Sequence, residues 1–438
     1  MHTLRSRIRV SRAPAAVLAA GACTVAVLAG LCQPAKAAAA PAPATITGQQ
    51  LESLENTIRA DSADYAGLWI DQNTDTVYIA AARSASAVSI TPSALLAQVP
   101  RTLTPAQAYG TATMKVDVIP VTYSAAQLQA ITAKIGTDTQ LQQVAAQAGS
   151  AITVWYVDPS TDTAVIGFSK VTAAETAEVQ AEFGDAARVI AQQPATPDVL
   201  RIPAGETLAQ ALRKEGVNVK PDTLAGPEYD AAPWYGGDPI EFDEGGHVYA
   251  CTSGYEFGGD KMSTAGHCAA SGSFWYNGNQ NKGQTYGTTY TVQFGNDRTD
   301  MRLLSGSYDP GIWAGSSGDT PEVLSGSGGV AMGEGTCDGG GDFGLNCDGH
   351  ITEIDATIPF CDNGSCWTEI DQDVSTDPSG DGCLAEPGES GAPVFTSTSR
   401  NAPWAIGTLT GAVGSGCNEA IFNDMYELKV IFGTSPIT

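Results

Sequence analysis

The stretch CLAEPGESGAPVF, from Cys383 to Phe395, places a serine between two glycines, with a glutamate before it and an apolar run after it. This pattern fits an ordinary tight turn before a strand. It also fits a serine held at a sharp bend, because glycine adopts backbone conformations that other residues avoid. At such a bend the hydroxyl is exposed and neighbouring N–H groups point toward one spot. The rest of the sequence has to decide between the two interpretations.

The composition is that of a globular, acidic protein. The chain has 438 residues, of which 42% are hydrophobic, and its net charge is −26. This length is enough for more than one hydrophobic core. Most of the negative charge lies from Pro233 onward, where 28 Asp and Glu outnumber six Lys and Arg. Because such a surface repels phosphate groups, we expect no nucleic-acid partner.

Residues 1–37 have the pattern of a secretory signal peptide. Four arginines precede an apolar stretch, Ala15–Leu31, and the sequence AKA at Ala35–Ala37 is an A-x-A cleavage site. The apolar stretch is also long enough for a membrane anchor, but the small residues that follow it favour cleavage. Cys23 and Cys32 lie here, and neither follows a convincing lipobox. We therefore expect a secreted, extracellular protein.

The other eight cysteines divide the chain into two halves. They all lie between Cys251 and Cys417, whereas Ala38–Ala250 has none. An even number of cysteines in an exported chain predicts disulfides. A Pro/Gly/Asp-rich stretch, Gly216–Pro239, is typical of an exposed linker. Nothing before that linker resembles a catalytic site.

The cysteine-free half contains an approximate repeat. YAGLWIDQNTDTVYIAA from Tyr65 and ITVWYVDPSTDTAVIGFS from Ile152 each predict a β-hairpin around a D-x-x-T-D-T turn. Two capping boxes predict the starts of helices, at Ser124 and at Thr172, and a glycine can end each helix. The predicted helices lie within Ser124–Gly136 and Thr172–Gly184. These elements form a small α+β domain, with the order strand-strand-helix-strand in its second unit.

The cysteine-bearing half predicts an all-β domain. Short apolar or aromatic runs, such as SFWYNGNQ and TTYTVQFGNDRTD, alternate with turns rich in Gly, Asn, Ser and Asp. Strands at this spacing are typical of a β-barrel or a sandwich. The run AIFNDMYELKVIF near the C-terminus fits either a strand or a helix.

Few residues can act as a base for Ser390. After the signal, the histidines are His247, His267 and His350. A lone histidine is more often structural, but His267 lies in STAGHC, directly before a cysteine. Together, TAGHC and EPGESGAP resemble the chymotrypsin-like serine proteases, and most closely the bacterial branch of streptogrisins and alpha-lytic protease. In that branch the histidine lies in T-A-G-H-C and the serine in E-P-G-D-S-G-G.

The resemblance covers roughly Tyr235–Phe432 and implies both fold and activity. The implied fold is two six-stranded antiparallel β-barrels, preceded by a small α+β pro-domain. The implied activity is that of a secreted serine endopeptidase made as a zymogen. Its partners would be protein or peptide substrates and its own pro-region, which assists folding and then inhibits. We expect a signal peptide at 1–37, a pro-region with a terminal linker at 38–230 and a protease domain at 231–438. We expect a monomer with no metal and no cofactor.

Two residues depart from the family pattern. Glu389 stands where Asp is usual, and Ala392 stands where the second Gly is usual. The added methylene and methyl groups must be accommodated beside the oxyanion hole, so the alternative is a catalytically impaired, protease-like binding protein. A non-peptidase acyl hydrolase is disfavoured, because the G-x-S-x-G serine elbow is absent and the histidine precedes the serine.

A triad also needs a carboxylate between His267 and Ser390, because chymotrypsin-like enzymes run His, Asp, Ser along the chain. NDRTDMRLL offers Asp297 and Asp300. Similarity to F-P-G-N-D-R of alpha-lytic protease favours Asp297. Asp300, however, begins the D-Φ-x-L-L pattern of the family's strand, and choosing Asp297 would leave a charge at a buried apolar position. The predicted triad is therefore His267, Asp300 and Ser390.

The resemblance implies further site residues. The N–H groups of Gly388 and Ser390 would form the oxyanion hole. The strand LTGAVGSGC would pair with substrate backbone through Thr410, Gly411 and Ala412.

The cysteines are expected to form disulfides, because a C-x2-C pair typical of a metal site is absent and the compartment is oxidising. By resemblance the pairs are Cys251–Cys268, Cys337–Cys347 and Cys383–Cys417, which leaves Cys361 and Cys366 for each other. An acidic loop is not spaced as an EF-hand, so a solvated loop is favoured over a calcium site; its aspartates are Asp371, Asp373, Asp377 and Asp381.

Overall fold

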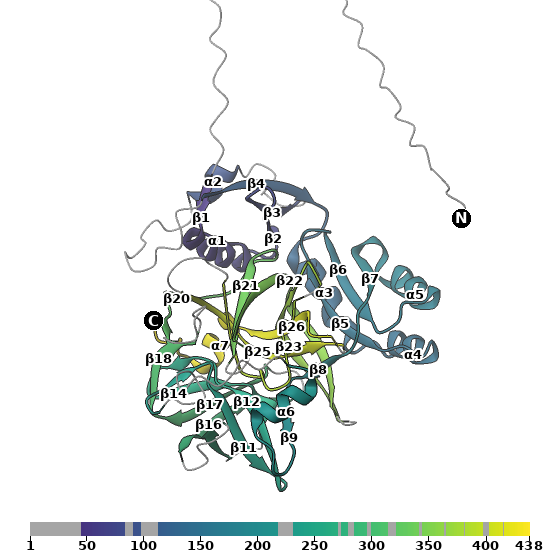
Figure 1. The fold of residues 1–438 in the computed structure, drawn as a ribbon. Helices are drawn as coiled ribbons and strands as arrows, with labels where there is room; N and C mark the ends of the chain where they lie inside the picture. Colours follow the sequence, from purple (N-terminus) through teal and green to yellow (C-terminus); the bar gives the residue numbers. More distant parts are fainter. Residues whose placement is uncertain are drawn as a thin grey trace, which may run out of the picture. The chain divides into compact units, whose positions relative to one another are not determined.

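The computed structural model describes most of the chain after the expected signal peptide (Figure 1). The described residues are 45–83, 91–97, 113–217, 231–269, 273–278, 284–295, 299–313, 321–340, 344–362, 365–380, 382–396, 403–414 and 416–438. The signal peptide expected at residues 1–37 therefore lies outside them. None of the helices in these ranges combines the length and the apolarity needed to span a membrane.

The first described unit is a small sheet with a helix packed on it. Its sheet order is β1-β4-β3-β2, in which only β3 and β4 run parallel. The helix α1 contributes Leu51, Leu54 and Ile58 to the same buried cluster as Ile79 of the sheet. The elements are β1 (Thr45–Thr47), α1 (Gly48–Ala60), β2 (Tyr65–Asp71), β3 (Thr76–Ala82), α2 (Pro92–Leu96) and β4 (Thr113–Val121).

The second unit repeats the hairpin. Strands β5 and β6 form an antiparallel pair around the second D-x-x-T-D-T turn, and β7 joins β6 in parallel. The capping boxes hold: Ser124 caps α3, which Gly136 ends, and Thr172 caps α5, which Gly184 ends. The elements β5, β6, α5 and β7 follow one another along the chain, which confirms the strand-strand-helix-strand order. The elements are α3 (Ala125–Ile135), α4 (Thr139–Gln147), β5 (Ile152–Asp158), β6 (Thr163–Phe168), α5 (Ala173–Phe183), η2 (Gly184–Ala186) and β7 (Ala187–Ala191).

A connecting segment follows before the β-barrels begin. It contains β8 (Ala195–Pro197), β9 (Leu200–Ile202) and α6 (Leu208–Glu215). The two strands do not pair with each other. Each adds instead to a sheet of the region that follows.

The N-terminal barrel is an antiparallel sheet in which β14, β17, β16, β15, β11 and β12 are neighbours in that order. The chain after β12 bonds back to β14, since the N–H of Gly254 donates to the carbonyl of Ser263 over 2.7 Å. The elements are β11 (Pro239–Glu244), β12 (His247–Thr252), β13 (Glu256–Phe257), β14 (Lys261–Thr264), η4 (Gly266–Cys268), β15 (Phe274–Asn277), β16 (Thr285–Gln293) and β17 (Met301–Gly306). A small separate sheet contains β10 (Trp234–Gly236), β18 (Tyr308–Ile312) and β19 (Glu322–Val323).

The C-terminal barrel is a closed ring of six antiparallel strands. Its order is β21-β24-β25-β26-β23-β22, and β22 pairs with β21 to complete the ring. Its core contains Leu409, Ile406 and Phe422, all fully buried. The elements are β20 (Gly326–Ser327), β21 (Gly335–Gly340), β22 (Gly344–Asp362), β23 (Ser365–Thr376), β24 (Pro393–Thr396), β25 (Trp404–Val413), β26 (Glu419–Asp424) and α7 (Met425–Phe432). The fold is thus the expected pair of β-barrels preceded by a small α+β region.

The ambiguous run near the C-terminus is both a strand and a helix. It changes from β26 to α7 at Asp424, whose side chain caps the helix by accepting from the N–H of Tyr426. A capping aspartate satisfies an otherwise unpaired N–H, which ends the strand and starts the helix at the same residue.

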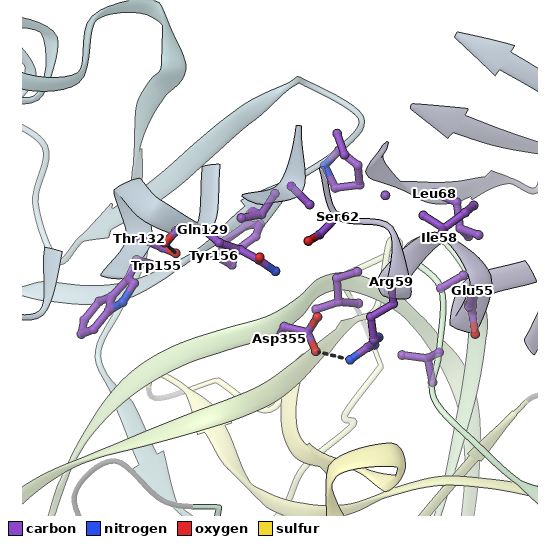
Figure 2. Close-up of a pocket in the computed structure, with 18 of the residues that line it drawn as sticks. Glu55, Ile58, Arg59, Ser62, Leu68, Gln129, Thr132, Trp155, Tyr156 and Asp355 are labelled. Atoms are coloured by element: carbon purple, nitrogen blue, oxygen red, sulfur yellow. Dashed lines mark hydrogen bonds and ion pairs between the residues drawn. The ribbon is translucent and has the colours of Figure 1, made fainter. Parts of the chain in front are cut away.

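The α+β region contacts the C-terminal barrel through α1 and β5. Strand β5 extends the barrel sheet, with Trp155 opposite Thr357 of β22. Figure 2 shows Arg59 of α1 directed at Asp355 of β22, where the two side chains form an ion pair of 3.1 Å. Arg59 also lies 3.7 Å from the buried carboxylate of Asp424.

Candidate active site

Ser390 lies in a bend that requires the glycines on both sides of it. Gly388 and Gly391 have φ values of +103° and +97°, in the left-handed region that glycine tolerates. A Cβ on Gly391 would also come within 2.1 Å of the carbonyl oxygen of Thr252. Strand β12 fixes the bend through Thr252. The N–H of Thr252 donates to the backbone carbonyl of Ser390 and its hydroxyl donates to the backbone carbonyl of Gly388, both over 2.8 Å.

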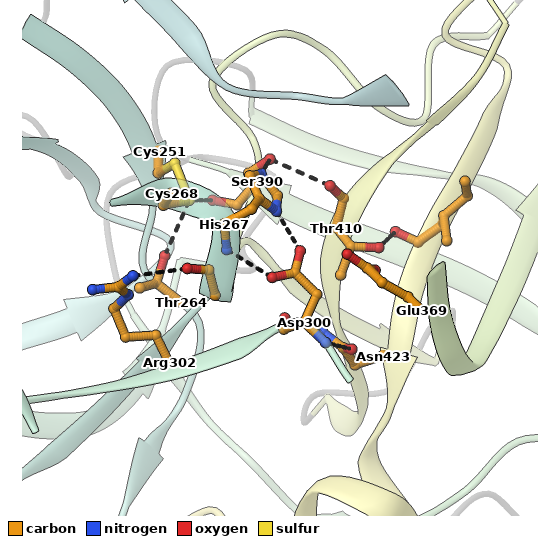
Figure 3. A network of polar contacts seen from close by, with 12 residues as sticks. Cys251, Thr264, His267, Cys268, Asp300, Arg302, Glu369, Ser390, Thr410 and Asn423 are labelled. Carbon is orange, nitrogen blue, oxygen red and sulfur yellow. Dashed lines mark hydrogen bonds and ion pairs between the residues drawn. A yellow bond between two sulfur atoms is a disulfide. The ribbon is translucent and has the colours of Figure 1, made fainter. Parts of the chain in front are cut away.

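The bend brings Ser390 against His267 and Asp300 (Figure 3). His267 Nε2 lies 2.8 Å from the hydroxyl of Ser390. On the other side of the ring, Nδ1 is hydrogen-bonded to Asp300 Oδ2, and the backbone N–H of His267 donates to Asp300 Oδ1 over 2.7 Å. Ser390 and Asp300 are fully buried. The other candidate, Asp297, lies outside the described residues.

The other two histidines are not part of this arrangement. His247 begins β12 and is exposed, and Arg201 donates to its ring over 2.8 Å. His350 lies in β22, opposite Gly335 and Thr376.

Asn423 supports the aspartate, and sequence analysis did not single it out. Its side-chain oxygen accepts from the N–H of Asp300 over 2.8 Å, and its amide donates to the carbonyl of Asp300 over 2.6 Å. Glu369 lies nearby. Burial, followed by the charge of Asp300, raises the pKa of Glu369 well above its usual range. No motif in the sequence linked β26 to Asp300.

Arg302 supports the histidine, and it too was missed. Its guanidinium is almost fully buried, donates to the carbonyl of Gly266 over 2.8 Å and also bonds to the carbonyl of Ala269. A further bond of 2.8 Å joins it to the hydroxyl of Thr289. Burial lowers the pKa of Arg302 to about 10, so it remains charged at neutral pH. One side chain therefore holds the backbone on both sides of His267.

The two departures from the family pattern are accommodated in buried surroundings. Glu389 bends back, and its carboxyl accepts from the N–H of Glu386 over 2.8 Å. Burial, and then the neighbouring carboxyl of Asp338, raise the pKa of Glu389 well above its usual range. Ala392 is fully buried in the barrel core with Val394.

The strand expected to pair with substrate is β25. Thr410 accepts the hydroxyl of Ser390 at its carbonyl over 3.4 Å. Gly411 and Ala412 form the edge against which β8 of the chain itself is paired. The N–H of Gly388, expected in the oxyanion hole, donates to the carbonyl of Asp198 over 2.5 Å.

The eight cysteines pair as expected from the sequence. The disulfides are Cys251–Cys268, Cys337–Cys347, Cys361–Cys366 and Cys383–Cys417. The first anchors the short helix η4, which carries His267, to strand β12.

The expectation of one solvated acidic loop is wrong for two of its aspartates, because Asp371 and Asp373 belong to strand β23. Asp377 closes a turn by accepting from the N–H groups of Ser379 and Gly382. Asp373 is buried within β23, and Asp381 lies outside the described residues. In the part of the chain that is described, no group of three His, Cys, Asp or Glu side chains could hold a metal ion.

Comparison with protein-family models gave a match in the α+β region. Residues 123–187 match the family model of the alpha-lytic protease prodomain. The chain has no significant match among curated proteins.

Solved structures that match include two bacterial enzymes. A chymotrypsin of Cellulomonas bogoriensis is 22% identical over 47% of this chain and 98% of its own, with a TM-score of 0.36. Protease A of Thermobifida fusca is 23% identical over the same shares, also with a TM-score of 0.36. Residues 123–187 are thus similar to the alpha-lytic protease prodomain.

Proposed function

We propose that this chain is a secreted serine endopeptidase made as a zymogen. Residues 38–230 are its pro-region, and residues 231–438 are the protease. The observation that carries the proposal is the hydrogen-bonded series Ser390, His267 and Asp300, with the N–H of Gly388 directed at a peptide carbonyl beside it.

The arrangement suits acyl transfer. A serine hydroxyl is a weak nucleophile, and His267 Nε2 is placed to take its proton as Ser390 Oγ attacks a peptide carbonyl. The same nitrogen then gives the proton to the leaving amine, which leaves an acyl-enzyme ester on Ser390. Water, activated by His267, hydrolyses that ester.

Asp300 and the bend supply the electrostatic part. Asp300 bonds to Nδ1 of His267, which fixes the imidazole tautomer and stabilises the imidazolium that forms. In this proposal the N–H groups of Gly388 and Ser390 stabilise the developing oxyanion, and such a donor is typically worth about 3 kcal/mol in the transition state.

The alternative is a protease-like binding protein that has lost its activity. It is disfavoured because Glu389 and Ala392 sit in buried positions while the hydrogen bonds around Ser390 are intact.

A serine-directed phosphonate probe tests the choice. We expect it to label the mature wild type at Ser390, and we expect Ser390→Ala to lose both labelling and casein hydrolysis. Ser365→Ala, at an exposed serine of β23, is the matched control and should be labelled normally. A well-folded wild type that neither reacts with the probe nor hydrolyses casein would favour the binding protein.

A further inference from the structure

A segment of the chain itself runs through the proposed active site. On one side of Ser390, β8 pairs antiparallel with β25, so that Pro197 lies opposite Gly411 and Thr196 opposite Ala412. The pairing continues past the strand, since the N–H of Gly414 donates to the carbonyl of Pro194 over 2.9 Å. The edge of β25 that was expected to bind substrate backbone is therefore occupied by residues 194–197.

On the other side of Ser390 the same segment pairs with the N-terminal barrel. Strand β9 lies antiparallel to β12, with Leu200 opposite Ala250 and Ile202 opposite Val248. The helix α6 then packs its buried face, including Leu208 and Leu212, against this edge. Two strand pairings, one on each barrel, thus fix the chain on both sides of a two-residue gap.

The two residues in the gap are Asp198 and Val199. The carbonyl of Asp198 accepts from the N–H of Gly388 over 2.5 Å. This is the donor proposed to stabilise the oxyanion, so the carbonyl that reaches it is the one that Ser390 would attack. The bond after that carbonyl joins Asp198 to Val199.

The Asp198 side chain is enclosed at this point. It is 7% exposed, and its Oδ2 is buried with no hydrogen-bond partner among the described residues. The charges of His267 and Glu386 shift the pKa of the Asp198 carboxyl. The charge of Asp198 in turn shifts the pKa of Glu389. Because an unpaired carboxylate is costly in a buried site beside other carboxyls, the neutral acid is the form that fits.

We propose that the protease cuts its own chain between Asp198 and Val199, and that its specificity pocket accepts the aspartic side chain in its uncharged form. This inference rests on the proposed protease function. Ser390 Oγ forms the bond to the Asp198 carbonyl carbon while its proton passes to His267. The C–N bond breaks, and that proton goes to the nitrogen of Val199. Water then hydrolyses the ester, which frees Ser390 and leaves a carboxyl terminus on Asp198.

The position of this cut precedes the linker that the sequence indicates. It leaves β9 and α6 on the N-terminal side of the protease, so a second cut is needed to remove them. The linker expected to be exposed as far as Pro239 is buried from β10 onward, where Trp234 is 2% exposed, so this cut must fall between residues 218 and 233. Asp198–Val199 is therefore the first of two processing steps.

The test follows the full-length chain through maturation. Wild type and Ser390→Ala are purified uncut, and the fragments are identified by mass spectrometry over time. We expect the first wild-type fragments to end at Asp198 and begin at Val199, at a rate independent of protein concentration, and Ser390→Ala to stay intact. A wild type that hydrolyses casein while this bond stays whole, or a cut of equal rate in Ser390→Ala, would overturn the inference. Mature protein, from which the segment has been removed, that fails to react with the phosphonate probe would instead overturn the proposed function.

Two variants test the side chain. Asp198→Asn is an uncharged isostere, and Asp185→Asn, at an exposed aspartate of the pro-region, is the control. Burial raises the pKa of Asp198 to about 7, so the carboxyl is uncharged below that pH and charged above it. We expect Asp198→Asn to be cut like wild type at pH 6, and the wild-type rate to fall relative to it by up to about tenfold per pH unit above pH 7. Asp185→Asn should follow wild type at every pH. A ratio of the Asp198→Asn rate to the wild-type rate that does not change between pH 6 and pH 9 would contradict an uncharged aspartic side chain in the pocket.

Discussion

Asp300 is fixed through its backbone before its carboxylate reaches His267. Its N–H and its carbonyl both bond to the side chain of Asn423, on strand β26 of the other barrel. The carboxylate then accepts from both the backbone N–H and the ring of His267. The geometry of the histidine thus depends on one residue from each barrel.

The asparagine variants separate the two candidate carboxylates. Asp300→Asn should lower kcat by about 10⁴-fold, because an amide permits the wrong imidazole tautomer. Asp297→Asn should leave activity within about tenfold if it is a surface turn residue. Steady-state kinetics on one peptide substrate checks both. The reverse ranking would leave the serine and the histidine in place and move the third member to Asp297.

At the scale of elements, hydrogen bonds to bends and disulfide crosslinks help to fix the short strands in place. The Ser390 bend is tied to β12 by Thr252, and Cys383–Cys417 joins the chain before the serine to the loop after β25. Crosslinks between such elements limit the freedom of the unfolded chain.

Removing the Cys383–Cys417 disulfide should lower stability substantially. Its cysteines are 34 residues apart, and the chain-entropy model gives a loss of about 3–4 kcal/mol for that loop when both are changed to serine. Denaturant unfolding of the variant in the Ser390→Ala background measures the loss. The same change at Cys361 and Cys366, which are 5 residues apart, should cost less. An equal loss at both disulfides would argue against loop closure as the cause.

Strand β22 carries a buried glutamate at its contact with the α+β region. Glu353 is 5% exposed, and burial, followed by the charge of Glu419, raises its pKa to about 8. The folded state therefore keeps a proton that the unfolded chain releases above its usual pKa. The contribution of Glu353 to the free energy of unfolding is complete below about pH 4.5 and is lost as the pH rises to about 8. The loss is at most about 1.4 kcal/mol per pH unit.

Glu353→Gln should make this pH dependence shallower. Glutamine keeps the shape of the side chain and has no proton to lose in this range. Unfolding of the Ser390→Ala zymogen between pH 5 and pH 8 measures the effect, with Glu215→Gln, at an exposed position of α6, as the control. If Glu353→Gln and the control gave the same slope as the parent, the buried glutamate would not be a source of the pH dependence.

At the scale of the whole molecule, the connecting segment covers the candidate site that it precedes. Strand β5 extends the C-terminal barrel, and β8 and β9 occupy the two edges that flank Ser390. Under the proposed function, the protease is inhibited for as long as this segment remains in place, as expected of a zymogen.

The mature enzyme should therefore lack the whole region. N-terminal sequencing of active, secreted protein should find a start between Leu224 and Trp234, after both processing steps. The physical reason is that β9 and α6 would otherwise still cover the edge of β12. Active enzyme whose N-terminus is still Ala38 would rule out a removable pro-region.

Local features could be predicted from the sequence because their causes are local. The hairpins at Tyr65 and Ile152 follow from a turn motif a few residues long, and the helices after Ser124 and Thr172 follow from capping boxes within four residues. The glycines around Ser390 likewise marked a bend that only they can form.

Other features depended on residues far apart in the chain. Asn423 lies 123 residues from Asp300, and Arg302 reaches back 36 residues to Gly266, so no short motif connected them. The passage of residues 194–202 between the two barrels was equally invisible, because a strand edge bonds through backbone groups that every residue shares. The sequence by itself determined the chemical types at the site and the local bends that display them. The tertiary structure alone decided which distant side chains hold them and which peptide bond lies against Ser390, since those choices rest on strand pairing and packing between separate elements.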